Sequence, residues 1–195
     1  MGLDWCLQAK PRENDKDKEK FYQLKSKLKL LSDKLYGNDE NDIIDKNDEL
    51  NEHNELNEHN EEENSELENK IEELLEGFNS ISITPHDSIS NLSNDDMIKL
   101  RNFTFGGSFE SNNYDFRGKV ISQSDILDET LKSEAYQHHT DEECIEYANK
   151  LEIFLTSLNK ENLNEEQQKD YDFIDKAIKW LKFWGEKGHG FSAWC

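Results

Sequence analysis

The chain has 195 residues, of which 44 are acidic and 23 are basic, so its formal net charge is −21. Only 33% of the residues are hydrophobic, and no run of about 18 apolar residues occurs, so we expect no membrane-spanning segment and no membrane partner. The acidic balance also disfavours nucleic acid as a partner, because binding to its phosphates requires basic patches. A chain of this length predicts a single domain, 1–195.

Cysteine usage and the basic residues bear on where the protein works. Cys6, Cys144 and Cys195 are too widely spaced to indicate a zinc site or a disulfide framework, so a reducing, cytoplasmic setting is the simplest expectation. Lysine outnumbers arginine by 20 to 3, a bias typical of AT-rich genomes. Such genomes include those of large DNA viruses, low-GC bacteria and some protists. For a viral protein, the location would be the host cytoplasm or the virion.

The first 36 residues predict a short strand and an amphipathic helix. Leu3, Trp5 and Leu7 alternate with less apolar neighbours, which indicates a strand over residues 2–8. Apolar residues from Phe21 to Leu35 follow a 3-4-3-4 spacing, which places one apolar stripe along a helix over residues 18–36.

An acidic, low-complexity segment follows this helix. Residues 38–76 hold 17 acids against two bases, and residues 51–62 contain a near-perfect repeat of six residues. Such polar sequence does not bury enough apolar surface to offset the backbone entropy lost on folding, about 1–2 kcal/mol per residue. We therefore expect residues 38–64 to be a disordered or weakly helical acidic insert, either a tolerated expansion or a functional acidic element.

A second amphipathic helix is predicted after the insert. Leu67, Ile71, Leu74 and Phe78 repeat the helical spacing, and Gly77 is expected to end the helix. The two helices are expected to form an antiparallel hairpin with the insert at its tip, where a long loop adds little entropic cost.

The middle of the chain predicts short elements. In chain order these are a strand over residues 80–84, a helix over 94–101, a strand over 103–105 and a helix over 124–136 behind Ser124. Residues 114–121 fit both a strand and a helix.

Two long helices and an apolar tail are predicted at the C-terminal end. Thr140 and Glu143 have the spacing of a capping box, which begins a helix that runs to about residue 158. A broad apolar surface over residues 164–185 indicates a central, buried helix. The tail, residues 188–195, contains Phe and Trp and is expected to fold back onto the core. The sequence as a whole predicts a helix-rich α+β fold with a helical hairpin, a few short strands and two long C-terminal helices.

Three segments carry a resemblance to other proteins. They are the opening Met-Gly-Leu-Asp-Trp, the stretch Tyr114–Lys119 (Tyr-Asp-Phe-Arg-Gly-Lys), and residues 180–190 with the pattern W-x-x-F-W-G-x-x-G-H-G. Together they resemble a group of uncharacterised proteins from microbes and large DNA viruses that share the first and the last of these motifs. The resemblance covers about a third of the chain and implies no activity. The Asn/Glu repeat departs from the pattern of the group, which favours its interpretation as an insert.

Asp4, Arg117 and His189 are the candidate catalytic residues, together with the polar neighbours Lys119 and His86. They lie among aromatic residues and glycines at the ends of predicted elements. If the tail packs beside the first strand, Asp4 and His189 become neighbours, and an Asp–His pair is how a general base is tuned. The alternative is structural: Asp4 and Arg117 form an ion pair, and His189 caps the preceding helix.

A second cluster contains metal-binding residue types. His138 and His139 precede Cys144, with three acids between them. Helix capping already explains the acidic run, and helical spacing directs Cys144 to the core, so we expect no metal and no cofactor.

Three functional hypotheses follow from the sequence. The first is a soluble intracellular protein that acts by binding a protein partner rather than as an enzyme, with large DNA viruses among its candidate sources. The second is a small enzyme or ligand-binding domain with a site near Asp4, Arg117 and His189. The third is an acidic mimic of nucleic acid.

Overall fold

The computed structural model describes residues 3–12, 15–36, 53–104 and 115–194. Where the sequence predicts one domain, the residue contacts separate two compact units. Unit 1 consists of Met1–Lys10 with Ile83–Cys195, and unit 2 is Pro11–Ser82. Unit 2 is therefore inserted into the sequence of unit 1. The chain changes units within two short strands that pair with each other, β2 (Lys10–Pro11) and β3 (Ser82–Ile83).

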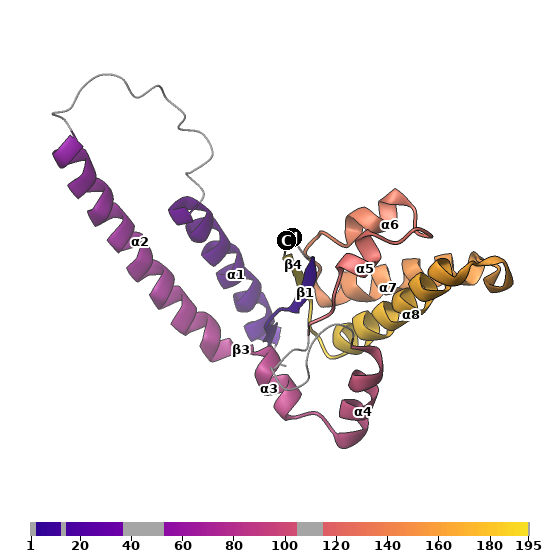
Figure 1. Cartoon of the computed structure of the whole chain (residues 1–195). Coiled ribbons are helices and arrows are strands. Elements are labelled where there is room, and N and C mark those ends of the chain that lie inside the picture. The colour runs from indigo at the N-terminus through magenta and orange to yellow at the C-terminus, as the bar shows by residue number, and fades with distance from the viewer. Residues whose placement is uncertain (1–2, 13–14, 37–52, 105–114, 195) are drawn as a thin grey trace. The chain divides into compact units, whose positions relative to one another are not determined.

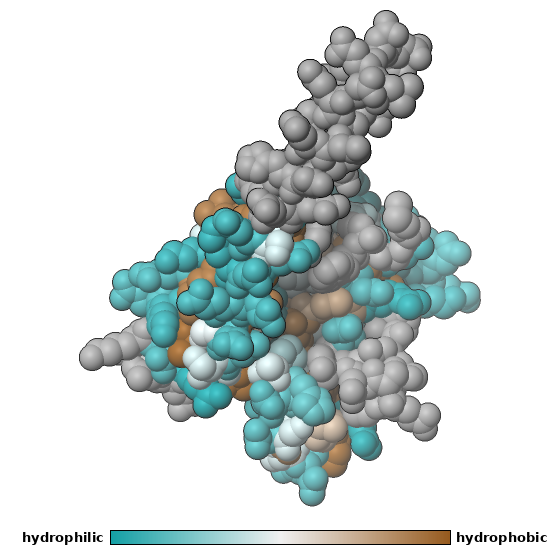
Figure 2. All heavy atoms as spheres, turned by 90° about the vertical axis from the view of Figure 1, so that its left-hand side faces the viewer, coloured by the Kyte–Doolittle hydropathy of each residue, from teal (hydrophilic) through white to brown (hydrophobic). Residues whose placement is uncertain are grey.

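Unit 2 is the predicted helical hairpin, built from α1 (Asp15–Tyr36) and α2 (His53–Ile81) (Figure 1). Phe21, near the start of α1, stacks on Phe78, near the end of α2, with ring centroids 4.6 Å apart, so the two helices are antiparallel. Phe21 and Leu67 are buried, as the apolar spacing predicts, and Ile81 at the end of α2 is buried as well. The face of the molecule shown in Figure 2 is mostly hydrophilic, with small apolar patches.

The second helix of the hairpin is longer than predicted at both ends. Of the predicted insert, residues 38–52 lie outside the described residues, whereas residues 53–64 form the first turns of α2. Gly77 does not end this helix, because Phe78 and Ile81 extend its apolar stripe by another turn. The predicted strand over residues 80–84 is correspondingly reduced to β3.

Unit 1 is helix-rich, which confirms the predicted fold class. Its helices are α3 (Pro85–Ser90), α4 (Asn94–Phe103), α5 (Lys119–Ser122), α6 (Glu129–Glu134), α7 (Asp141–Ser157), the 3-10 helix η2 (Lys160–Asn162) and α8 (Glu165–Glu186). The long helices α7 and α8 pack side by side, and α4 and α5 contact α8 (Figure 1). Ile174, Ala177 and Leu181 of α8 are fully buried, as expected for a central helix.

The C-terminal tail folds back onto the core, as predicted. Its strand β4 (Phe191–Trp194) pairs antiparallel with β1 (Asp4–Leu7), and Trp5 lies opposite Ala193. Trp5 also pairs with Phe116: the Trp5 N–H donates to the Phe116 carbonyl at 2.7 Å, and the Phe116 N–H donates to the Trp5 carbonyl at 3.0 Å. The ambiguous stretch 114–121 is therefore extended at Phe116 and becomes helical at α5.

One predicted helix start is confirmed, and two other predictions in unit 1 are wrong. Thr140 and Glu143 form the predicted capping box at the start of α7. The helix predicted behind Ser124 begins instead at Glu129, because Asp128 supplies the cap, while the Ser124 hydroxyl donates to Asp170 at 3.0 Å. The strand predicted over residues 103–105 is wrong at Phe103, the last residue of α4; Phe105 lies outside the described residues.

Candidate functional site

Two of the three predicted catalytic residues meet at the outer edge of β1. Trp5 pairs with Phe116, and their neighbours Asp4 and Arg117 point to the other side of the two strands. There the Arg117 Nε lies 3.7 Å from Asp4 Oδ1. Both side chains are about half exposed, at 52% and 48%. A surface ion pair of this kind contributes about 0–1 kcal/mol. This ion pair is the first half of the structural alternative that the sequence left open.

A thiol and a carboxyl group lie beside this ion pair. Cys6 hydrogen-bonds to Asp115, a residue that the sequence analysis did not single out. Burial, and secondarily the nearby Asp115 carboxylate, raise the pKa of the Cys6 thiol to about 11. Burial likewise raises the pKa of Asp115 above its ordinary value. Because thiolates are the nucleophilic form, a protonated Cys6 is unsuited to covalent catalysis at neutral pH.

His189 lies away from Asp4 and Arg117. The β1–β4 register places Asp4 opposite Trp194 and Leu7 opposite Phe191. His189 comes two residues before Phe191, so it lies beyond the end of the strand pair that is far from Asp4. The five residues from His189 to Trp194 span about 16 Å in extended conformation. The structure therefore does not bring the predicted Asp–His pair together.

The buried His189 side chain has two hydrogen-bond partners of its own. Its Nδ1 lies 2.7 Å from the Gln8 carbonyl oxygen, and its Nε2 lies 2.7 Å from the Ser88 hydroxyl. Since a carbonyl only accepts, Nδ1–H donates to Gln8 and Nε2 accepts from Ser88.

This chain of contacts has the order of a nucleophile, a base and an orienting group. However, burial lowers the pKa of His189 to about 4, whereas an effective general base has a pKa near the working pH. The arrangement suits a buried anchor for the C-terminal tail. The other two polar neighbours are separate: His86 is exposed on α3, and Lys119 begins α5.

The predicted His/Cys cluster is part of the core. His139 is buried, its Nε2 lies 2.9 Å from the Glu134 carbonyl oxygen, and its ring stacks on Phe191 at 4.7 Å. Cys144 is buried, and burial raises the pKa of its thiol to about 12. Among the described residues no three His, Cys, Asp or Glu side chains lie together as a metal site.

A hollow between α4 and α8 is a further candidate site in unit 1. We call it the α4–α8 groove. Its volume of about 420 Å³ is within the range of small-ligand and peptide sites. It is lined by Asp96, Lys99 and Phe103 of α4, and by Lys179, Lys182, Phe183, Glu186 and the following Lys187 of α8.

The local sequence explains how the two helices form this groove. In α8, residues 179, 182, 183 and 186 have the spacing i, i+3, i+4 and i+7, so they form one stripe beside the buried face of the helix. In α4, Leu100 and Phe103 are buried and hold the helix against the core. The Phe103 and Phe183 rings, 5.5 Å apart, supply the apolar part of the groove.

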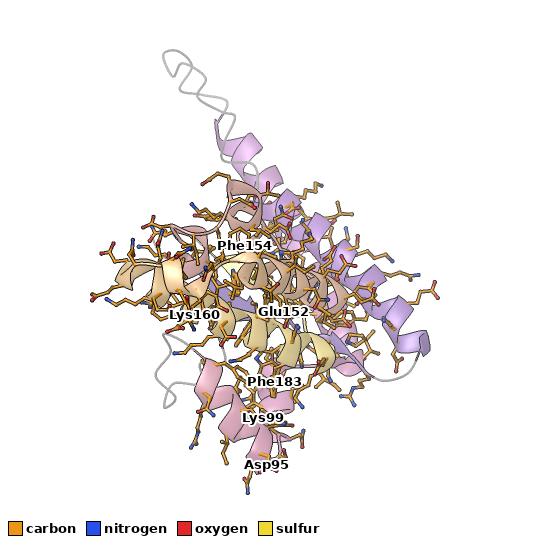
Figure 3. All side chains as sticks on the ribbon, turned by 90° about the vertical axis from the view of Figure 1, so that its right-hand side faces the viewer. Asp95, Lys99, Glu152, Phe154, Lys160 and Phe183 are labelled. Carbon is orange, nitrogen blue, oxygen red and sulfur yellow. The ribbon has the colours of Figure 1, made fainter. Side chains whose placement is uncertain are left out.

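Four lysines line the groove beside these two rings. Figure 3 shows Glu152 of α7, Phe183 of α8 and Lys99 of α4 along one face of the molecule. The Lys187 ammonium lies 2.9 Å from Asp96 and 4.8 Å from the Phe183 ring centroid, and the Lys182 ammonium lies 2.7 Å from Glu152. The hydrogen bond from Lys187 lowers the pKa of Asp96 below its ordinary value. The other two lysines of the groove are paired as well, Lys99 with Asp96 at 3.7 Å and Lys179 with Asp175 at 2.5 Å. Since partly exposed ion pairs contribute little stability, carboxylates of a bound partner can compete with these internal ones.

Sequence reasoning missed this groove. Lys99 and Lys179 are eighty positions apart, and only the packing of α4 on α8 brings them to one site. The stripe on α8 was a detectable signal, because Lys179 and Lys182 lie on the same side of the helix as Phe183, an aromatic residue that is only partly buried.

Comparisons of the chain with family models, with curated proteins and with solved structures find no match. Within the described residues, no helix has the length and apolar character needed to cross a membrane.

Proposed function

We propose that this protein acts by binding another protein, and that the α4–α8 groove takes an acidic segment of the partner that carries one apolar side chain. The observation that carries the proposal is the concentration of four lysines around two phenyl rings in a chain with a net charge of −21.

The charge contrast supports an acidic partner. Unit 1 holds 22 acids against 13 bases, whereas the groove lining holds two acids against four lysines. Within unit 1, an acidic segment is repelled by most of the surface and attracted to the lysines of the groove, which favours one orientation of binding. In unit 2, α1 also carries an excess of lysines, seven against four acids. The Phe103 and Phe183 rings offer the apolar contact that such interfaces use as an anchor.

The setting of this binding is also a proposal. We place it in the cytoplasm of a cell, or of a host cell if the gene is viral. Support comes from the wide spacing of the three cysteines and from the lysine bias of an AT-rich genome.

Binding of a fluorescein-labelled probe tests the proposal. The probe is a short peptide of Asp and Glu with one central Phe, and its fluorescence anisotropy is followed during titration with the full chain. We expect Lys179→Glu to weaken binding roughly tenfold, which corresponds to about 1.4 kcal/mol. Lys169→Glu is the matched control, since it makes the same charge change on α8 about 15 Å from Lys179.

Two further probe peptides test the apolar contact and the electrostatic contact separately. Replacing the central Phe by Ser should weaken binding, and replacing the acids by Lys should abolish it. Equal binding of the acidic and basic peptides, or equal losses in the two lysine variants, would overturn the proposal.

A further inference from the structure

We propose that a second copy of this chain supplies the acidic segment: the surface of α2 around Leu75 in one copy docks into the α4–α8 groove of another. We call this surface, formed by Glu68, Glu72, Leu75 and Glu76, the Leu75 face. The inference rests on the proposed function of the groove and identifies its occupant.

The Leu75 face has the chemistry that the groove requires. Its four residues have the spacing i, i+4, i+7 and i+8, so they share one side of α2, and all four are exposed. Leu75 is 42% exposed, although most leucines of the hairpin lie in the stripe between the helices. An apolar side chain surrounded by three glutamates is therefore presented to solvent.

Charge complementarity favours this helix as the occupant. Over His53–Ile81, α2 carries ten acids and one lysine. The groove lining holds four lysines and two acids, and each lysine is paired with an acid of its own chain, so the glutamates of the Leu75 face would replace those internal partners. From Glu68 to Glu76 the Leu75 face extends eight residues, as do the groove residues of α8 from Lys179 to Lys187. Each span is about 12 Å at the rise of an α-helix, so the acidic and basic stripes match in length.

The groove and the Leu75 face are different surfaces, and each copy has one of each. Two copies can therefore exchange both contacts as a two-fold dimer, or the contacts can continue into a larger ring or a chain of copies. The net charge of −21 on each copy opposes association at long range, whereas the contact acts within a Debye length, about 8 Å at physiological ionic strength. The association is therefore weak and depends on protein concentration.

Sedimentation velocity of the full chain, over a range of concentrations at constant salt, tests the proposal through a charge swap. The groove variant is Lys99→Glu with Lys179→Glu, and the α2 variant is Glu72→Lys with Glu76→Lys. We expect each variant alone to self-associate at least about tenfold more weakly than the wild type. Combining the four substitutions in one chain, or mixing the two variants, should restore association because the new charges are again opposite.

The matched control reverses two glutamates elsewhere on the same helix. Glu66 and Glu73 lie outside the Leu75 face, on the flank of α2 beyond Glu76, so Glu66→Lys with Glu73→Lys changes the net charge equally at positions that the proposed contact does not use. We expect this variant to associate at least as well as the wild type. Circular dichroism checks that every variant is folded.

The outcomes distinguish this inference from the proposed function. A wild-type chain that stays monomeric, a swap that fails to restore association, or a control that weakens it as much as the α2 variant would overturn the inference. If the wild type is monomeric but the acidic peptide binds, the second copy is the wrong occupant and the groove remains a protein-binding site. If the peptide does not bind, both proposals fail.

Discussion

Trp5 is the residue that connects the most distant parts of unit 1. It is fully buried, its Nε1–H donates to the Ala135 carbonyl at 2.8 Å, and its ring lies 4.8 Å from Phe191 and 5.3 Å from Phe116. One side chain from the first strand therefore contacts the middle and the end of the chain. The alternating pattern of residues 2–8 predicted that Trp5 faces inward, but it contained no information on which segments would surround the ring.

Truncation of this side chain should strongly destabilise the fold. We expect Trp5→Ala to lower the free energy of unfolding by about 3–5 kcal/mol, because it removes a large buried ring and leaves a cavity. Trp5→Phe keeps an aromatic ring but leaves the Ala135 carbonyl without its donor, so its loss should be smaller, about 1–3 kcal/mol. Urea denaturation measures both, and a Trp5→Ala chain as stable as the wild type would contradict the packing described here.

His189 should make stability depend on pH in mildly acidic solution. Burial depresses its pKa from 6.5 to about 4, so between these values the unfolded chain binds a proton that the native chain does not. The stability contribution of the neutral ring is complete above pH 6.5 and is lost as the pH falls towards 4.

The measurement compares the wild type with His189→Gln at pH 7 and pH 5. The variant is less stable at pH 7 because it loses the paired imidazole, but the difference between the two proteins should narrow at pH 5. Other titrating groups, including Asp115 with its raised pKa, contribute alike to both proteins and cancel in this difference. A difference that stays constant with pH would exclude a buried neutral His189.

At the scale of elements, local sequence patterns predicted the long helices, the short helix α4 and the strand β1, but they misplaced the start of α6 and predicted a strand at Phe103. The apolar spacing from Phe21 to Leu35 and the capping box at Thr140 are complete within one segment, and both predictions were confirmed. Ser124 fits a helix start by local chemistry, but its hydroxyl is used by Asp170, a partner 46 residues away. Boundaries of this kind depend on distant contacts, which no local pattern contains.

Two glycines show the same distinction between local and tertiary effects. A Cβ on Gly118 would overlap the buried Trp5 ring, whereas a Cβ on Gly77 would make an ordinary contact, 3.8 Å from Leu24. We expect Gly118→Ala to destabilise the protein by about 1–3 kcal/mol through overpacking. Gly77→Ala, inside α2, should stabilise the hairpin by about 0.5–1 kcal/mol through helix propensity. Thermal unfolding checks both; a neutral Gly118→Ala would contradict the close approach to Trp5.

At the scale of the whole molecule, the candidate site was predictable only in part. Sequence reasoning identified Asp4 and Arg117, which the structure joins as a surface pair, and His189, which it places elsewhere. It did not identify the α4–α8 groove, because the net charge describes the whole chain, and the many acids elsewhere hide the lysines of one site. The four lysines of the groove come together only after α4 packs on α8.

The pairing of β1 with β4 has a consequence for how the protein is made. On the ribosome β1 emerges before every helix described here, and β4 emerges after all of them. Unit 2 contains only neighbouring segments and is able to fold while translation continues, since such contacts form rapidly. Trp5 must wait for Phe191, so unit 1 acquires its closing strand last, and a nascent chain that stalls before β4 leaves an aromatic core open to chaperones and proteases.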